Sequence, residues 1–142
     1  MHDRSKVPSG YKFHHIGYAT DSIDRERKFL EILGYRIEGS IFADLRQGIN
    51  GCFMIGSGPR IELLENSAGS NTLTPWIDAG IKMYHIAYWV NRIDEALDWA
   101  RGQRARVVAP PVPAPAFNGR LIAFVIFRNG QMMEFIERDF EK

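Results

Sequence analysis

The sequence HIGYA at residues 15–19 reappears as HIAYW at residues 85–89, seventy positions further along the chain. A second similarity joins IELLE at residues 61–65 to MEFIE at residues 133–137, with an offset of seventy-two positions. Two matches that frame segments of similar length indicate an internal duplication, with a two-residue difference in loop length. The duplication predicts that the chain contains two copies of one module.

The pattern of apolar residues and turn signals predicts the same βαβββ order of elements in each copy. In the first copy, the strand, helix and three strands are expected near residues 13–19, 22–33, 35–42, 51–55 and 60–65. In the second copy, they are expected near residues 84–90, 93–103, 106–109, 121–127 and 132–137. A linker over residues 66–82 contains a short predicted helix at residues 74–79. We therefore expect one domain over residues 1–142, with modules at about 11–65 and 83–138.

The proline-rich run APPVPAPA at residues 109–116 is expected to form an ordered, partly extended loop. Proline has no backbone N–H and a fixed φ, so this run cannot be a helix or a central strand. The loop is interpreted either as a surface connection or as a rim or lid over a pocket, because long loops are often functional.

The composition excludes several classes of partner. Of 142 residues, 45% are hydrophobic and 25% charged, which is typical of a folded globular chain. The 18 basic and 17 acidic side chains are mixed along the chain and give a net charge of +1, so no nucleic-acid or membrane partner is predicted. Cys52 is the only cysteine and is interpreted as a small buried hydrophobe. The polar segment Met1–Lys12 lacks an apolar run, which favours the cytoplasm.

Strand alternation predicts where the polar residues of the repeat point. Side chains two residues apart share a face, so the histidine and glutamate of each copy alternate with large apolar residues that a helix would cover. The two histidines and two glutamates are therefore expected on the inner face of the sheet, where a carboxylate is costly to bury unless it is paired or bound to a metal. This mixed nitrogen and oxygen set suits a first-row divalent ion, and its members are His15, Glu62, His85 and Glu134. His14 is the competing ligand, but alternation places it on the opposite face or at the edge.

These motifs resemble the vicinal oxygen chelate superfamily, over nearly the whole chain from Tyr11 to about Arg138. The resemblance implies an α+β fold in which two tandem βαβββ modules form a cupped mixed β-sheet with helices on the outer face. It also implies that His15, Glu62, His85 and Glu134 are the ligands of one divalent metal ion (Co, Ni, Zn, Mn or Mg).

Within the superfamily, the sequence looks most similar to methylmalonyl-CoA epimerases and next to glyoxalase I enzymes. The segment Gln47-Gly48-Ile49 and the residue Ala19 favour the epimerase. The resemblance implies an isomerase, epimerase or lyase that abstracts a proton next to a metal-chelated carbonyl, with Glu134 and Glu62 as the catalytic carboxylates. The expected substrate is an acyl-CoA thioester or a hemithioacetal-like carbonyl compound, and a homodimer is expected.

Three alternatives remain open. A glyoxalase I-type lactoylglutathione lyase would use the same four residues. A non-catalytic small-molecule binding or resistance protein would have the same fold, but such proteins usually lack the metal ligands. An extradiol dioxygenase is less favoured, because its iron takes two histidines and one carboxylate, and Glu62 would add a fourth protein ligand.

Overall fold

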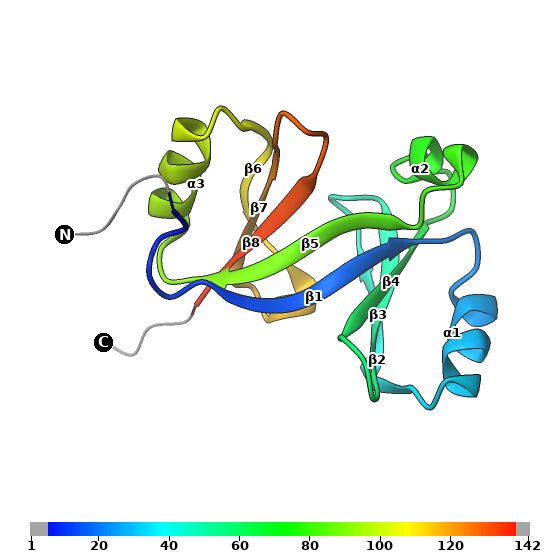
Figure 1. The fold of residues 1–142 in the computed structure, drawn as a ribbon. Helices are drawn as coiled ribbons and strands as arrows, with labels where there is room; N and C mark the ends of the chain where they lie inside the picture. The colour runs from blue at the N-terminus through cyan, green and yellow to red at the C-terminus, as the bar shows by residue number, and fades with distance from the viewer. Residues whose placement is uncertain (1–5, 139–142) are drawn as a thin grey trace. The chain divides into compact units, whose positions relative to one another are not determined.

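The structure, a computed structural model, describes residues 6–138 and confirms the predicted α+β class with two consecutive βαβββ modules (Figure 1). The first module comprises β1 (Lys12–Ala19), α1 (Ile23–Ile32), β2 (Arg36–Asp44), β3 (Ile49–Ile55) and β4 (Ile61–Asn66). The second comprises β5 (Met83–Val90), α3 (Ile93–Gly102), β6 (Arg106–Pro113), β7 (Leu121–Ile126) and β8 (Met132–Glu137). Helix α2 (Thr74–Ala79) lies in the linker, and the 3₁₀ turn η1 (Pro115–Phe117) joins β6 to β7.

The strands form a mixed sheet in the order β2-β3-β4-β1-β5-β8-β7-β6. In each module the first strand pairs in parallel with the last, and the three later strands pair antiparallel. The register of the parallel pair is the same in both modules, because Gly17 lies opposite Glu62 and Ala87 lies opposite Glu134. The duplication seen in the sequence is therefore also a duplication of strand register.

By its contacts the chain divides into two compact units, one of residues 15–84 and one that joins the N-terminal segment to residues 85–142. The first unit contains the last five residues of β1, and the second contains the start of β1 and most of β5. Each unit has its own hydrophobic core.

In the unit of residues 15–84, α1 covers one face of β3 and β4. Ser22 begins the helix, and its Oγ accepts a hydrogen bond from the backbone N–H of Arg25 at 3.1 Å. Ile23 and Leu30 from the helix pack against Cys52, Met54 and Leu63 from the strands. Cys52 is fully buried in this core, which confirms the sequence interpretation, and burial raises the pKa of its thiol to about 11.

In the second unit, α3 covers β7 and β8. The small residues Ala96 and Ala100 let the helix lie close to the sheet, where it contacts Val125 and Phe135. Tyr11, just before β1, completes this core, since its ring lies 5.6 Å from the ring of Trp99 and 5.7 Å from that of Phe135. Burial raises the pKa of the Tyr11 hydroxyl.

The proline-rich run differs from the prediction, because residues 109–113 belong to strand β6 and only the last part of the run leaves the sheet. Strand β6 is at the end of the strand order, so only one of its edges pairs. The pairing with β7 also shifts register between Val107 and Ala109 and again between Ala109 and Val112. An irregular edge strand tolerates proline, because the missing N–H groups are not needed by a neighbour.

Among residues 6–138, no helix is long and apolar enough to cross a membrane.

Candidate metal centre

Two of the four predicted ligands, His15 and Glu62, form a first pair in contact within the unit of residues 15–84. His15 lies on β1 and Glu62 on the adjacent parallel strand β4. His15 Nε2 is 3.0 Å from Glu62 Oε1, and the two side chains are 0% and 6% exposed. A carboxylate and an imidazole thus meet almost entirely out of contact with solvent.

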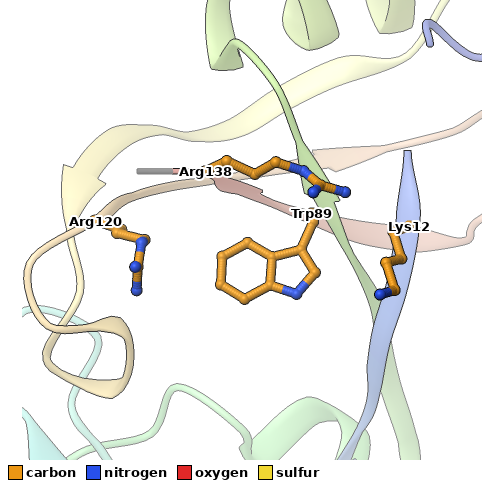
Figure 2. Close-up of a pocket in the computed structure, with 4 residues that line it drawn as sticks. All are labelled: Lys12, Trp89, Arg120 and Arg138. Carbon is orange, nitrogen blue, oxygen red and sulfur yellow. The ribbon is translucent and has the colours of Figure 1, made fainter. Parts of the chain in front are cut away.

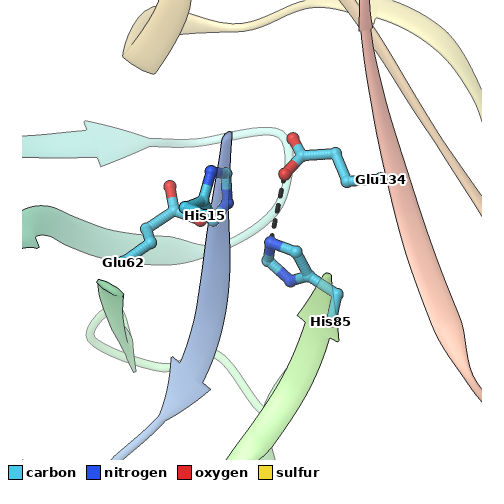
Figure 3. A group of neighbouring side chains, drawn as sticks. All are labelled: His15, Glu62, His85 and Glu134. Carbon is cyan, nitrogen blue, oxygen red and sulfur yellow. Dashed lines mark ion pairs between the residues drawn. The ribbon is translucent and has the colours of Figure 1, made fainter. Parts of the chain in front are cut away.

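The second pair, His85 and Glu134, repeats this arrangement in the other unit. His85 Nε2 on β5 is 3.1 Å from Glu134 Oε1 on β8, and the side chains are 2% and 4% exposed. Figure 3 draws both pairs and marks the contact between His85 and Glu134. Each pair therefore joins the first and last strands of its own module.

The position of each glutamate follows from strand alternation. Ile61 and Leu63 point into the core beneath α1, so Glu62 between them points to the other face of β4. In the second unit, Met133 and Phe135 belong to the core beneath α3, and Glu134 between them points away from it. Both pairs therefore lie on the face of the sheet that their module helix does not cover, as predicted.

An aromatic ring against each histidine is a feature that the sequence analysis missed. The ring of Phe53 lies 5.2 Å from His15, and the ring of Phe124 lies 5.2 Å from His85, both edge to face. Phe53 is opposite Glu62 in the β3–β4 ladder, and Phe124 is opposite Glu134 in the β7–β8 ladder. The two phenylalanines are seventy-one positions apart, so extending the repeat comparison to these strands would have found them.

The second glutamate of each motif has a structural role on the opposite face. Glu65 and Glu137 lie three residues after Glu62 and Glu134, and an odd spacing along a strand reverses the face. Glu65 Oε1 accepts a hydrogen bond from the backbone N–H of Ile23 at 2.9 Å, at the start of α1. Glu137 Oε2 accepts one from Ile93 at 2.9 Å, at the start of α3. Each carboxylate thus stabilises the N-terminus of its module helix.

His14, the competing ligand, is placed in the second unit, among aromatic side chains. Its ring lies 5.2 Å from the ring of Trp89 and 5.4 Å from that of Phe117, both edge to face. The adjacent His15 belongs to the first unit and contacts Glu62. The two consecutive histidines therefore have different surroundings.

A family model for the Glyoxalase/Bleomycin resistance protein/Dioxygenase superfamily matches residues 14–124. This range includes three of the four candidate metal ligands and ends before Glu134. Among curated proteins, no relative matches the chain.

Solved structures with the same fold cover nearly all of the chain. A hypothetical protein of Bacillus halodurans C-125 is 26% identical, with a TM-score of 0.78 over 94% of this chain and 99% of its own. The methylmalonyl-CoA epimerase of Mycobacterium tuberculosis is 19% identical, with a TM-score of 0.76 over 98% of this chain and 97% of its own. A variant of the Streptomyces coelicolor methylmalonyl-CoA epimerase, in complex with 2-nitronate-propionyl-CoA, is 18% identical, with a TM-score of 0.70 over 91% of this chain and 98% of its own. At these identities the two epimerases show that the fold is shared, and they do not identify the activity of this chain.

Proposed function

Because the chain belongs to the Glyoxalase/Bleomycin resistance protein/Dioxygenase superfamily, we propose that it is a metal-dependent isomerase, epimerase or lyase that abstracts a proton next to a carbonyl group. The observation that carries the proposal is the buried His–Glu pair in each of two duplicated modules. Together the pairs supply two imidazole nitrogens and two carboxylates, from His15, Glu62, His85 and Glu134, to one divalent ion.

The chemistry of the donors fits such an ion. Nitrogen and carboxylate ligands lie about 2.1 Å from a small divalent metal, so two donors at right angles on it are roughly 3.0 Å apart. The separations within the two pairs are 3.0 Å and 3.1 Å. A buried carboxylate is also costly without a compensating charge, and a bound cation would supply that charge. Four protein ligands leave open positions on a six-coordinate ion of Co, Ni, Zn, Mn or Mg.

In this proposal, the metal would polarise the substrate carbonyl and stabilise the negative charge that develops when the adjacent C–H loses its proton. Glu134 is the base that takes this proton, and Glu62 is the second carboxylate able to return one to the other face of the same carbon. His15 and His85 remain fixed, because Phe53 and Phe124 pack against their rings. The net result is inversion at the carbon, or transfer of its proton to a neighbouring atom.

An acyl-CoA thioester is our first candidate substrate, ahead of a hemithioacetal. Two observations support it: the sequence likeness of residues 47–49 to epimerases, and the propionyl-CoA analogue in complex with the Streptomyces coelicolor epimerase of the same fold. A lactoylglutathione lyase activity is the runner-up. The lyase and the epimerase would use the same metal ligands and the same proton abstraction, so the two activities differ in their substrate and not in their metal centre.

The test is proton exchange in deuterium oxide. Metal-loaded protein is incubated with methylmalonyl-CoA or with the hemithioacetal of methylglyoxal and glutathione, and deuterium at the carbon next to the carbonyl is followed by mass spectrometry. We expect rapid incorporation into the acyl-CoA, and only the slow uncatalysed exchange after the metal is stripped. Turnover of the hemithioacetal alone would identify the activity as that of a lactoylglutathione lyase. No metal-dependent turnover of either compound would contradict the proposal and favour the non-catalytic alternative.

A further inference from the structure

A basic pocket lies in the unit that contains most of β5, apart from the His85–Glu134 contact. It has a volume of about 260 Å³ and is lined by Lys12, Trp89, Arg120 and Arg138. Figure 2 shows the indole ring of Trp89 with the three cationic side chains around it. None of these residues belongs to the proposed metal centre.

Four separate segments of the unit supply the lining. Lys12 begins β1, Trp89 lies near the end of β5, and Arg138 directly follows β8. Arg120 comes from the turn after η1, so the end of the proline-rich segment returns to the sheet at this pocket. The pocket is therefore a product of the fold and not of one basic stretch of sequence.

Trp89 is held as a rigid wall of the pocket. The rings of His14 and Phe117 pack edge to face against it, with centroids 5.2 Å and 5.9 Å away. The guanidinium carbon of Arg120 lies 5.5 Å from the centre of the indole ring, within cation–π range. Arg138 is fixed in turn, because its Nη2 donates to the carbonyl oxygen of Gly10 at 2.9 Å.

The pocket concentrates positive charge. Among residues 6–138, no carboxylate lies within ion-pair distance of Lys12 or Arg138. Asp139 and Glu141 follow in the sequence and lie outside the described residues. Three cations around one small pocket match a ligand with more than one negative charge, and guanidinium groups suit phosphate oxygens in particular.

We infer that Lys12, Trp89, Arg120 and Arg138 bind a phosphate-bearing group of the substrate, of the nucleotide kind that coenzyme A carries. The cations contact the phosphate oxygens, and Trp89 forms an apolar wall beside them. The assignment of this group to the substrate rests on the proposed function. Binding of a phosphate-bearing probe to the pocket is independent of the proposed function.

The spacing along β5 favours coenzyme A over glutathione. Trp89 and His85 share one face of the strand and are four residues apart, which is roughly 13 Å at 3.3 Å per residue. The long pantetheine arm of coenzyme A separates its phosphates from its thioester. In glutathione the chain between the sulfur and each carboxylate is shorter than the pantetheine arm, so coenzyme A matches this spacing better.

The experiment measures binding by isothermal titration calorimetry on the whole chain, with coenzyme A, adenosine 3′,5′-bisphosphate, adenosine and pantetheine as probes. We expect coenzyme A and the bisphosphate to bind, with affinity that falls as salt is added, and the two uncharged probes to bind far more weakly. Lys12→Gln and Arg138→Gln should each weaken coenzyme A binding about tenfold. Lys12 is exposed, so its replacement leaves the core intact. Arg128→Gln is the matched control, because Arg128 is an exposed arginine of the same unit outside the pocket. The Arg128→Gln variant should bind coenzyme A as tightly as the wild type.

Equal coenzyme A affinity in the Lys12, Arg138 and Arg128 variants would overturn the inference, and so would adenosine binding as tightly as its bisphosphate. His85→Ala separates this inference from the proposed function. If that variant loses deuterium exchange but still binds the bisphosphate, both proposals stand. If wild-type protein binds the bisphosphate but catalyses no exchange, the phosphate site stands and the proposed function fails.

Discussion

At the scale of single residues, Glu62 and Glu134 have similar surroundings in their two modules. Each is buried, lies 3.0–3.1 Å from a histidine and is opposite a phenylalanine on the neighbouring strand. The local geometry therefore makes either one a suitable ligand and base. Only variants that keep an oxygen donor can separate the two roles.

We expect Glu134→Gln to keep the metal and lose turnover. Glutamine retains an oxygen donor and similar volume but removes the basic carboxylate, so deuterium exchange should fall by about 10²-fold or more. Metal content, measured on the same sample, should stay close to that of the wild type. Glu62→Gln is the matched comparison. Full activity in Glu134→Gln, or silencing by Glu62→Gln alone, would refute the assignment of the base.

Cys52 should be unreactive in the folded protein. Burial raises its pKa from 9.0 to about 11, so at pH 8 the thiolate that attacks labelling reagents is about 100-fold scarcer than in the unfolded chain. Because burial disfavours the thiolate, only the unfolded chain ionises readily here, and the free energy of unfolding should fall as the pH rises from 9 towards 11. Labelling with a thiol reagent at pH 8, with and without denaturant, measures the difference. Rapid labelling of the native protein would show that this core opens readily.

At the scale of elements, each module helix depends on a glutamate from the last strand of its module. We expect Glu137→Ala to destabilise the protein by about 1 kcal/mol, because the backbone N–H of Ile93 loses its acceptor and the helix loses a nearby negative charge. Glu137→Gln keeps an acceptor oxygen and should cost less. Urea unfolding measures both. Equal stability of Glu137→Ala and wild type would contradict the role of this contact in the fold.

The repeat allowed most elements to be predicted, and local signals located their ends. Helix α2 was predicted at its observed residues, because Pro75 suits a first helical turn. In the structure Gly80 ends the helix with a φ of 72°. The extension of β6 through Pro113 was missed, because whether a strand is at an edge depends on the order of strands and not on its own sequence.

The sequence also predicted part of the candidate site in each module. Alternation and repeat spacing selected His15, Glu62, His85 and Glu134 as candidate ligands from the sequence alone. That they contact one another as His15–Glu62 and His85–Glu134 is a finding of the structure. The aromatic partners Phe53 and Phe124 were missed, because they come from strands whose register no short motif reveals. The basic pocket was also missed, and no comparison of the two repeats would have found it. Its lining comes from four distant segments, and mixed charge along a sequence does not exclude concentrated charge in space.

At the scale of the whole molecule, the sheet ends in two edge strands, β2 and β6. The prolines and register shifts of β6 make it a poor template for further pairing, whereas Ile41 on β2 is 53% exposed. We therefore expect a homodimer at micromolar concentration, which sedimentation velocity would detect. A monomer across that concentration range would contradict this prediction and leave the metal centre unaffected.

We propose that both modules contribute ligands to one metal centre, and the number of metal ions bound per chain tests this proposal. Protein is loaded with a divalent metal, desalted and analysed by elemental mass spectrometry, beside His85→Ala and the control His14→Ala. We predict one ion per chain in the wild type and in His14→Ala, and almost none in His85→Ala, with unchanged circular dichroism in all three. A wild-type chain that retains no metal, or a His85→Ala chain that retains one, would rule out a shared centre of this composition.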